Sequence, residues 1–336
     1  MARTKQLQKD ISNTGYTADA GMQRIMNRDG SLNVRRKGLN WWQRNSIYHT
    51  MISLSPARFM LVVFLFYTST NLIFACIYTL LGIDKLQGID PVSGFGEKFM
   101  QAFFFSSQTL TTVGYGHISP KGMAANIVAS LESFIGIMAF AIVTGLFFAR
   151  FARPRAFLRF SDNLIMSPFK DSAAFMLRVI SAKNISLTDV QAEVTTAFEV
   201  EENGKKSTRY FQLPLQFSRI NSLALSWTVV HIIDEKSPFY GLSLEEIKNS
   251  NLEVMINIRA FDEHYSNTVQ QRISYKGNEI LYGARFLPAF VPSEDGRTTI
   301  LKVQKLNHHE KLEEAHVAAI LEKIKLDQGK NDDAKA

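Results

Sequence analysis

The chain has 336 residues, a formal net charge of +7 and 46% hydrophobic residues, with a mean hydropathy of -0.05. These values exclude a protein that lies entirely in a membrane, yet the apolar residues gather before residue 152 and charged residues dominate after it. The single cysteine, Cys76, excludes an internal disulfide and argues against a disulfide-built secreted domain. We therefore expect a membrane half joined to a soluble half.

Helical spacing of apolar residues appears first between Trp41 and Ser53. The pattern ends at Ser55-Pro56, because the residue before a proline avoids helical dihedrals. Since two tryptophans stand at its start and a long apolar stretch soon follows, the segment is predicted to be a helix in the membrane interface. An ordinary amphipathic helix packed on soluble protein is the alternative.

Two apolar stretches are long enough to cross a bilayer. Phe59–Gly82 contains no charged residue, and Met123–Ala149 is interrupted only by Glu132. Between them, Glu97–Leu110 contains no Gly or Pro and is rich in Phe and Ala. It is too short to span, so we interpret it as a re-entrant half-helix that leads into a loop at membrane depth.

The distribution of basic residues predicts the topology. Residues 1–58 carry ten Lys or Arg against three acidic residues, whereas residues 83–122 carry three of each. Arg150, Arg153 and Arg155 follow the second apolar stretch directly. By the positive-inside rule, both termini are expected in the cytoplasm of a multi-pass plasma-membrane protein. Most of the basic excess is then topological, and no nucleic-acid recognition motif accompanies it.

After Pro154 the pattern becomes that of β-strands. Apolar and polar residues alternate from Val190 to Glu201, as in a half-buried strand, and Asn203-Gly204 is a strong hairpin signal before Tyr210-Phe211. Many short strands between turns predict an all-β sandwich. From His308 onward the charged, Ala/Lys-rich sequence predicts a short helix and then a disordered tail. Further β-rich runs lie at Ala224–Ile233, Leu252–Phe261, Thr268–Tyr275 and Glu279–Phe286.

The segment Thr112-Val113-Gly114-Tyr115-Gly116 follows the half-helix and carries the chemistry. Selecting K⁺ requires that oxygen ligands replace its water, and backbone carbonyls, here those of Thr112, Val113, Gly114 and Tyr115, are suitable neutral ligands. Aiming successive carbonyls at one axis needs dihedrals that glycine alone adopts cheaply, as at Gly114 and Gly116. Val113 and Tyr115 are expected to pack against the half-helix. One chain supplies too few carbonyls for a cage, so three further identical subunits are predicted.

With Thr111 before it, this segment matches the potassium-channel signature. Two spans without a voltage sensor, followed by a β-rich half, resemble the inward-rectifier potassium channel family, and most of all its prokaryotic branch. The resemblance covers roughly residues 29–290 and implies a homotetramer with an immunoglobulin-like cytoplasmic β domain and a slide helix at Trp41–Ser53. The local patterns that support it are Asp29-Gly30-Ser31 with Asn33, Ala149-Arg150-Phe151-Ala152-Arg153-Pro154, Leu225-Ser226-Trp227-Thr228, Ser237-Pro238-Phe239-Tyr240-Gly241 and Ile280-Leu281-Tyr282-Gly283 with Arg285-Phe286.

The resemblance also implies gate positions. Gly136 matches the glycine where the inner helix is proposed to bend, although close helix packing at a small residue explains it equally well. Phe148 matches the bulky residue at the bundle crossing, where four rings would gate by dewetting. Phe147 and Leu146, its neighbours, are the alternatives if the register is off by one. Phe140 lies where strongly rectifying relatives carry a cavity acid, so strong voltage-dependent block at this position is doubtful.

Acidic residues provide further candidates. Glu132 is expected at the cavity, behind or just below the filter, where it braces the filter, or it stays protonated without an electrostatic role. The resemblance implies that Glu193 and Glu263 line the cytoplasmic pore, where polyamines or Mg²⁺ act as blockers, and solvated surface charge is the alternative. Arg44, Arg150, Arg153 and Arg155 are expected to form a basic belt that attracts anionic lipid headgroups. Topological anchoring alone is the alternative for this belt.

The expected organisation is an N-terminal segment at 1–40, a slide helix at 41–56, a pore domain at 57–154, a β domain at 155–307 and a C-terminal helix or tail at 308–336. The sequence predicts a K⁺ channel subunit gated at the inner bundle, with K⁺ as permeant ion, no cofactor and no enzymatic motif. A non-conducting membrane sensor and a channel of other selectivity are the competing hypotheses. The glycines oppose the first, and the absence of acidic filter side chains opposes the second.

Overall fold

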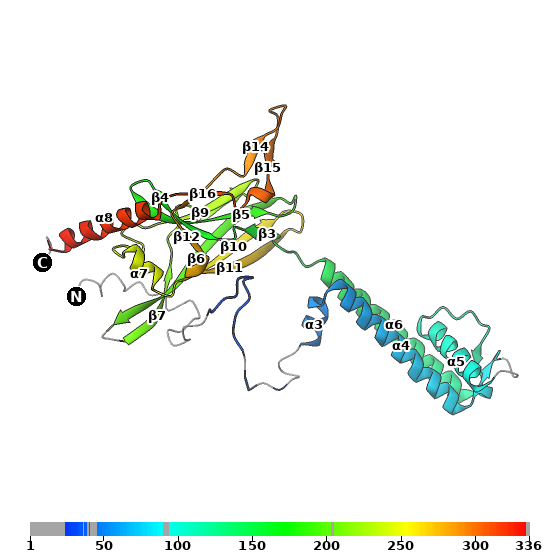
Figure 1. The fold of residues 1–336 in the computed structure, drawn as a ribbon. Coiled ribbons are helices and arrows are strands. Elements are labelled where there is room, and N and C mark those ends of the chain that lie inside the picture. Colours follow the sequence, from blue (N-terminus) through cyan, green and yellow to red (C-terminus); the bar gives the residue numbers. More distant parts are fainter. Residues whose placement is uncertain are drawn as a thin grey trace. The chain divides into compact units, whose positions relative to one another are not determined.

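The computed structural model describes residues 24–35, 37–38, 40, 46–89, 94–202 and 205–333. The chain divides into two compact units (Figure 1). One unit, the pore domain, comprises residues 36–153. The other, the β domain, comprises residues 154–336 together with residues 1–35. The N-terminal segment thus belongs structurally with the β domain, although more than a hundred residues separate the two in sequence.

The pore domain is built from helices α3 (Ile47–Ser53), α4 (Pro56–Leu81), α5 (Phe95–Leu110) and α6 (Met123–Phe151). The hydroxyl of Ser46 caps α3, and Pro56 begins α4 at a position where its missing N–H costs nothing. Within the described residues, α4 and α6 are long and apolar enough to cross a membrane. At about 24 Å in length, α5 is too short to do so. The predicted spans and half-helix are confirmed.

The loops on either side of α5 are held together by a short pairing. Strand β1 (Leu86–Gln87), which follows the single turn η1 (Ile83–Lys85), pairs with β2 (Ser119–Pro120) beyond the filter segment. Gly88 has a φ of 89°, and a Cβ there would lie 1.9 Å from the carbonyl oxygen of His117. Only glycine permits this approach, which fixes the entrance of α5 against the exit of the filter segment.

The β domain is a sandwich of two five-stranded sheets whose facing sides form one core. One sheet has the order β11-β10-β6-β7, with β8 also paired to β6. The other has the order β12-β4-β5-β3, with β9 also paired to β5, and its β12–β4 pair is parallel. The strands are β3 (Leu158–Phe160), β4 (Leu164–Phe169), β5 (Ser172–Ser181), β6 (Leu187–Glu202), β7 (Lys205–Gln212), β8 (Arg219–Ser222), β9 (Ser226–Ile232), β10 (Glu253–Asp262), β11 (Asn267–Lys276) and β12 (Ile280–Tyr282).

Smaller elements complete the β domain. Helix α7 (Leu244–Lys248) begins with a capping box between Ser243 and Glu246. Helix α8 (Glu314–Asp333) has 20 residues and is therefore longer than the short helix expected from the sequence. It buries Val317 and Leu321 in the core, and this burial stabilises it. The remaining elements are β13 (Ala284–Phe286) paired with β16 (His309–Lys311), β14 (Phe290–Pro292) paired with β15 (Thr299–Leu301), and the turns η2 (Gly277–Glu279) and η3 (Val303–Lys305).

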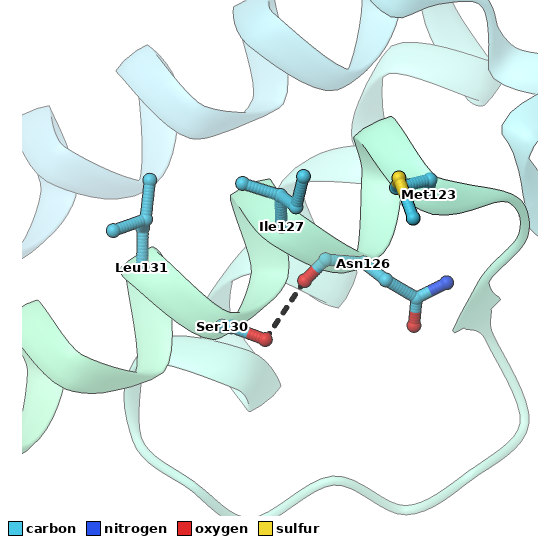
Figure 2. A pocket seen from close by; sticks show the side chains of 5 residues that line it. All are labelled: Met123, Asn126, Ile127, Ser130 and Leu131. Carbon is cyan, nitrogen blue, oxygen red and sulfur yellow. Dashed lines mark hydrogen bonds between the residues drawn. The ribbon is translucent and has the colours of Figure 1, made fainter.

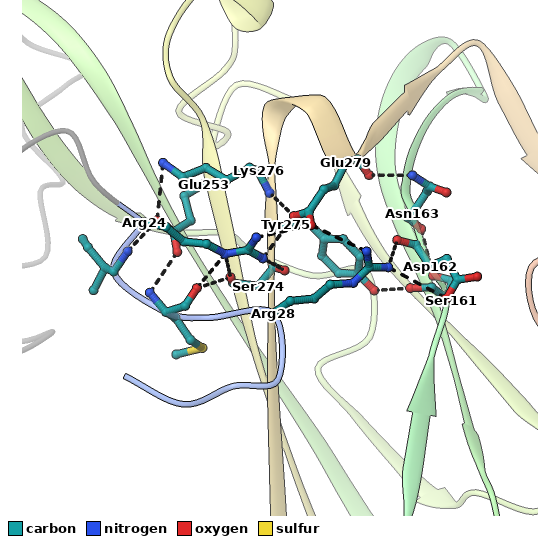
Figure 3. A network of polar contacts seen from close by, with 12 residues as sticks. Arg24, Arg28, Ser161, Asp162, Asn163, Glu253, Ser274, Tyr275, Lys276 and Glu279 are labelled. Carbon is teal, nitrogen blue, oxygen red and sulfur yellow. Dashed lines mark hydrogen bonds and ion pairs between the residues drawn. The ribbon is translucent and has the colours of Figure 1, made fainter. Parts of the chain in front are cut away.

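Residues 24–33 form a docked N-terminal segment on strands β10 and β11 (Figure 3). The buried carboxylate of Glu253 accepts hydrogen bonds from the backbone N–H groups of Ile25 (3.0 Å) and Met26 (3.1 Å). Arg24 pairs with Glu279 at 3.0 Å and donates to the carbonyl oxygen of Ser274 at 2.6 Å. The start of the segment is therefore fixed to the sheet by charge-assisted hydrogen bonds.

The motif Asp29-Gly30-Ser31 forms the turn of this segment. Asp29 Oδ1 accepts hydrogen bonds from the N–H and the hydroxyl of Ser31, and these bonds lower the pKa of the Asp29 carboxyl group. Gly30 has a φ of 81°, and a Cβ there would lie 2.4 Å from the carbonyl oxygen of Arg272 on β11. A glycine is thus required both by the turn and by its contact with the sheet.

Candidate ion-conduction site

The filter segment begins where α5 ends. Positive φ values recur at alternate residues, with 59° at Thr112, 51° at Gly114 and 81° at Gly116. The N–H groups of Val113 (2.9 Å) and Gly114 (3.3 Å) both donate to the carbonyl oxygen of Gln108, which ties the segment to the last turn of α5. The two glycines occupy the conformations expected of them. The left-handed conformation of Thr112 was not predicted, and it is a strained one for a β-branched residue.

The apolar and aromatic side chains of the filter segment are largely uncovered within one chain. Val113 is 53% exposed and Tyr115 is 79% exposed in the isolated chain. Their own chain leaves both side chains largely uncovered, so their packing against the half-helix stays a prediction. Three backbone N–H groups tie the start of the segment to α5. That of Thr112 donates to the carbonyl oxygen of Thr109, and those of Val113 and Gly114 donate to the carbonyl oxygen of Gln108. Apolar and aromatic side chains this exposed at membrane depth require cover from outside the chain.

The end of α5 rests directly on α6. A Cβ at Gly136 would lie 1.8 Å from the carbonyl oxygen of Leu110, the last residue of α5. One helical turn earlier along α6, Ser133 Oγ donates to the carbonyl oxygen of Thr109 at 3.4 Å. Gly136 thus allows the backbones of α5 and α6 to touch next to the filter segment. This contact matches the close-packing alternative for Gly136, as opposed to a bend of α6.

Glu132 is buried among all three long helices of the pore domain. Its carboxyl group accepts a hydrogen bond from Tyr78 Oη on α4 at 2.7 Å and contacts Ser106 Oγ on α5. Its side chain has no exposed surface. The structure therefore places Glu132 in the packed interior, and not on an open surface such as a cavity wall. Sequence analysis missed Tyr78, Ser106 and Asn71 as its neighbours, although polar residues in apolar helices are themselves a signal.

Two phenylalanines of α6 face away from the rest of the chain. Phe140 is 76% exposed and Phe148 is 74% exposed, and they stand two helical turns apart. Phe147, by contrast, lies with its ring centroid 4.7 Å from that of Phe151 and 6.3 Å from that of Phe59 on α4. Phe147 thus packs on rings of its own chain. Phe148, which does not, is the better candidate for a position that faces the other subunits.

The basic residues predicted to contact lipid have unequal surroundings. Arg150 donates hydrogen bonds to the carbonyl oxygens of Met51 (2.7 Å), Ile52 (3.2 Å) and Leu54 (2.7 Å). Its guanidinium also lies 4.7 Å from the centre of the Phe59 ring. Arg150 therefore caps the end of α3 and joins it to α6. Arg153 and Arg155 are exposed, and Arg44 lies outside the described residues.

The acidic candidates of the β domain are both exposed. Glu193 on β6 accepts a hydrogen bond from Asn257 Nδ2 on β10 at 3.2 Å. Glu263 lies in the turn between β10 and β11, directly after the buried Asp262. Glu193 therefore lies on the strand next to β10, and Glu263 lies in the turn that follows β10. Neither carboxyl group forms an ion pair with a described residue.

The N-terminal end of α6 carries an open hollow of about 580 Å³ (Figure 2). Met123, Ile127 and Leu131 give it an apolar lining, and Ser130 donates its proton to the carbonyl oxygen of Asn126. No described charged residue lines it, so the hollow resembles an uncovered helix-packing surface more than an ion site.

Two membrane-length helices that flank a short helix and a strained glycine-containing loop define this membrane protein as an ion channel. Residues 61–153 match the family model described as "Ion channel", and residues 158–326 match that of the inward rectifier potassium channel C-terminal domain. The chain is 33% identical over 290 residues to inward rectifier potassium channel Kirbac3.1 of Paramagnetospirillum magnetotacticum, with 85% of this chain and 96% of the relative covered. The chain therefore belongs to the inward-rectifier potassium channel family.

More distant relatives include inward rectifier potassium channel 18 of Homo sapiens, 27% identical over 250 residues, with 69% of this chain and 58% of the relative covered. G protein-activated inward rectifier potassium channel 4 of Mus musculus is 27% identical over 290 residues, with 79% of this chain and 68% of the relative covered. The chain is thus an inward-rectifier potassium channel subunit and not an enzyme, and its family implies tetrameric assembly.

Proposed function

We propose that Thr112–Gly116 from four identical chains forms the K⁺-selective filter, with the carbonyl oxygens of Thr112, Val113, Gly114 and Tyr115 as ligands. The observation that carries this proposal is the alternation of positive φ values at residues 112, 114 and 116 directly after α5. The exposed Val113 and Tyr115 support four-fold assembly, because neighbouring chains supply the cover that one chain lacks. The apolar hollow on α6 is a second surface for such a neighbour to cover.

Rubidium flux into liposomes that contain the purified protein tests the filter. In Gly114→Ala, a φ of 51° costs an L-residue about 1–2 kcal/mol, so ordered carbonyls and flux should both be lost. Gly296→Ala is the matched control, because Gly296 also has a positive φ with open space around it but lies in the β14–β15 hairpin. Equal flux in Gly114→Ala and the parent, or equal passage of Na⁺ and K⁺ in the parent, would reject the filter assignment.

The gate is proposed at Phe148, whose four copies would close the inner end of the pathway by dewetting. Its exposure within the single chain and the engagement of Phe147 by Phe59 support this choice. Phe148→Ala should raise basal rubidium flux, because a smaller side chain widens a constriction. Phe134→Ala is the control, since Phe134 is also exposed on α6 but lies nearly four helical turns away. Unchanged flux in Phe148→Ala would exclude a gate at this residue.

For the membrane topology, we propose that both termini and the β domain are cytoplasmic, with a slide helix at 41–56, a pore domain at 57–154, a β domain at 155–307 and a C-terminal helix or tail at 308–336.

The exposed Arg153 and Arg155, together with Arg44, are the candidates for binding anionic headgroups, each attracting them by about 1 kcal/mol. Flux in liposomes with and without anionic lipid, repeated in Arg153→Gln with Arg155→Gln, measures the sign of the response. No difference between the lipids would reject modulation at these residues.

Block by spermine or Mg²⁺ is proposed to act through Glu193 and Glu263, because both are exposed and unneutralised. Phe140 supplies no charge to a cavity site, so block should be weak. Glu263→Gln should weaken block of outward current by internal spermine. Glu294→Gln is a control at another exposed acid of the β domain. Block that is identical in Glu263→Gln and in the parent would remove this residue from the proposal.

A further inference from the structure

Four polar side chains meet in the interior of the pore domain, and we name them the three-helix polar cluster. Asn71 and Tyr78 lie on α4, Ser106 lies on α5 and Glu132 lies on α6, and all four are fully buried. Tyr78 Oη donates to Glu132 Oε2 at 2.7 Å. Ser106 Oγ contacts Glu132 Oε1 and also lies 3.1 Å from Asn71 Oδ1. Three polar contacts therefore join three helices.

The orientation of the Asn71 amide is fixed by a fourth contact. Asn71 Nδ2 donates a hydrogen bond to the carbonyl oxygen of Tyr67 at 2.9 Å. Turning the amide over would place its oxygen against that carbonyl oxygen, with no proton between two acceptors. The atom of Asn71 that faces Ser106 is therefore Oδ1, which can only accept.

The number of available protons then determines the state of Glu132. If the carboxyl group were ionised, only the hydroxyl protons of Tyr78 and Ser106 would be available for three contacts. The Tyr78 proton serves the contact with Glu132, and Ser106 has a single proton for its two contacts with Glu132 and Asn71. Two buried acceptors would be left facing each other without a proton. A proton on Glu132 Oε1 removes the conflict. Glu132 donates to Ser106, Ser106 donates to Asn71, and Tyr78 donates to Glu132, so each contact has its own proton.

Among the described basic residues of the pore domain's own helices, none stands close enough to favour the ionised form of Glu132. Among the residues that the structure describes, none forms an ion pair with Glu132. The basic residues of the same three helices are Arg58, Lys98 and Arg150, and each stands at least about two helical turns from the cluster residue of its own helix. An unpaired carboxylate in a membrane-spanning segment is costly, whereas a carboxylic acid with both oxygens hydrogen-bonded is not.

We propose that Glu132 is a neutral carboxylic acid in the native channel, and that its proton directs the hydrogen-bond chain Glu132–Ser106–Asn71 that positions α5 between α4 and α6. Glu132, Ser106 and Asn71 are positioning residues, because all three are buried within the chain and lie outside the filter segment. Their effect on conduction rests on the proposed function, since α5 leads into the filter segment. The protonation state itself does not depend on that assignment.

Infrared spectroscopy of the purified full-length protein tests the protonation state. At about pH 8, exposed Asp and Glu side chains are ionised, so a carbonyl band of a protonated carboxylic acid reports a buried acid. We expect this band in the parent protein and its loss in Glu132→Gln. Glu97→Gln, which changes an exposed acid of α5, should retain it. Absence of the band from the parent, or its persistence in Glu132→Gln, would overturn the proposal.

Heat resistance of the tetramer tests the positioning role. Glutamine can donate to Ser106 and accept from Tyr78 as a neutral acid does, whereas leucine can do neither. We expect Glu132→Leu to shorten the half-life of the heated tetramer by roughly tenfold, the scale for stranded buried polar groups, and Glu132→Gln to recover most of that loss. Equal damage in both variants would refute the proposal. If the parent protein shows the acid band but no rubidium flux, that result would contradict the proposed filter and would leave the protonation of Glu132 supported.

Discussion

Arg150 Nη2 donates a hydrogen bond to the carbonyl oxygen of Leu54 at 2.7 Å, and this bond joins helix α6 to the C-cap residue of α3. The same guanidinium donates to the carbonyl oxygens of Met51 and Ile52 and stacks on Phe59. The last carbonyls of a helix have no partner within the helix, so a cation placed there is especially effective. Helices α3 and α6 are thereby linked through one side chain.

Replacing Arg150 by Lys should weaken that link although the charge is kept, because a lysine ammonium cannot reproduce the planar fork that reaches three carbonyl oxygens. We expect backbone amides of residues 47–54 to exchange with deuterium roughly tenfold faster, which corresponds to the loss of one or two hydrogen bonds. Hydrogen exchange followed by mass spectrometry measures this. Arg155→Lys, at an exposed position, is the control. Unchanged exchange in Arg150→Lys would mean that charge alone matters there.

Replacing Gly136 by Ala should separate the end of α5 from α6, because the new Cβ would lie 1.8 Å from the carbonyl oxygen of Leu110. We expect a destabilisation of about 1–3 kcal/mol, the scale for overpacking, together with reduced selectivity for K⁺ over Na⁺. Gly145→Ala is the matched control, since Gly145 is also helical but has open space around it. Selectivity from liposome flux and tetramer melting provide the measurements.

A pure hinge at Gly136 gives a different result. Alanine would then stiffen α6 and change how often the channel opens, while ion selectivity and tetramer melting stayed as in the parent protein. That outcome would contradict the close-packing role.

His231 should make the β domain less stable in acid. The ring is buried, with Nδ1 2.6 Å from the carbonyl oxygen of Pro214 and Nε2 2.8 Å from Ser237 Oγ. Burial lowers the pKa of His231 to about 4 from its ordinary 6.5. The unfolded chain therefore binds a proton at a higher pH than the folded chain. Stability is complete above pH 6.5 and is lost as the pH falls from 6.5 towards 4, by roughly 3 kcal/mol at about 1.4 kcal/mol per pKa unit.

Urea unfolding of the full chain at several pH values tests this. Replacing Trp41 and Trp42 by Phe leaves Trp227 on β9 as the fluorescent reporter, because the chain has 3 tryptophans. The free energy of unfolding should fall with pH in this background and should fall less in His231→Gln. His264→Gln, which changes an exposed histidine, should behave like the parent. Identical slopes in all three proteins would exclude His231 as the source.

Glu253→Gln should release the docked N-terminal segment. The glutamine keeps one acceptor oxygen but presents an amino group to a backbone N–H, so one charge-assisted hydrogen bond becomes a clash of two donors. The expected cost is about 2 kcal/mol, and residues 24–33 should become accessible to protease. Glu193→Gln, at an exposed carboxylate on β6, is the control. Protection of the segment that is unchanged in Glu253→Gln would contradict the role of this carboxylate.

Much of the pore domain could be predicted because its signals are local. Uninterrupted apolar runs define α4 and α6, the absence of Gly and Pro defines α5, and the spacing of Gly114 and Gly116 marks the filter segment. The alternation along β6 likewise predicted its buried face. In each case a period or a backbone requirement is written into consecutive residues.

Other features were hidden because they depend on contacts distant in sequence. Strand β5 is buried on both faces, so its apolar residues, interrupted by Arg178, show no alternation and the strand was not predicted. The outward face of Ala197 on β6 is covered by Ile25 and Met26, some 170 residues earlier in the chain. Arg150 was assigned to lipid from its place after a span, and its hydrogen bonds to carbonyl oxygens of another helix could not be foreseen from that place. Charge position alone cannot distinguish these roles.

The cover that Ile25 and Met26 give to the sheet bears on how the protein can be shortened. Ala197, Tyr210 and Met255 lie beneath them as a buried cluster. Trimming the chain to start at α3 would bare this patch to water and leave the Glu253 carboxylate without its two backbone donors. We expect such a truncated protein to aggregate through the apolar surface that it exposes. An affinity tag should therefore be added before residue 24 and should not replace residues 24–33.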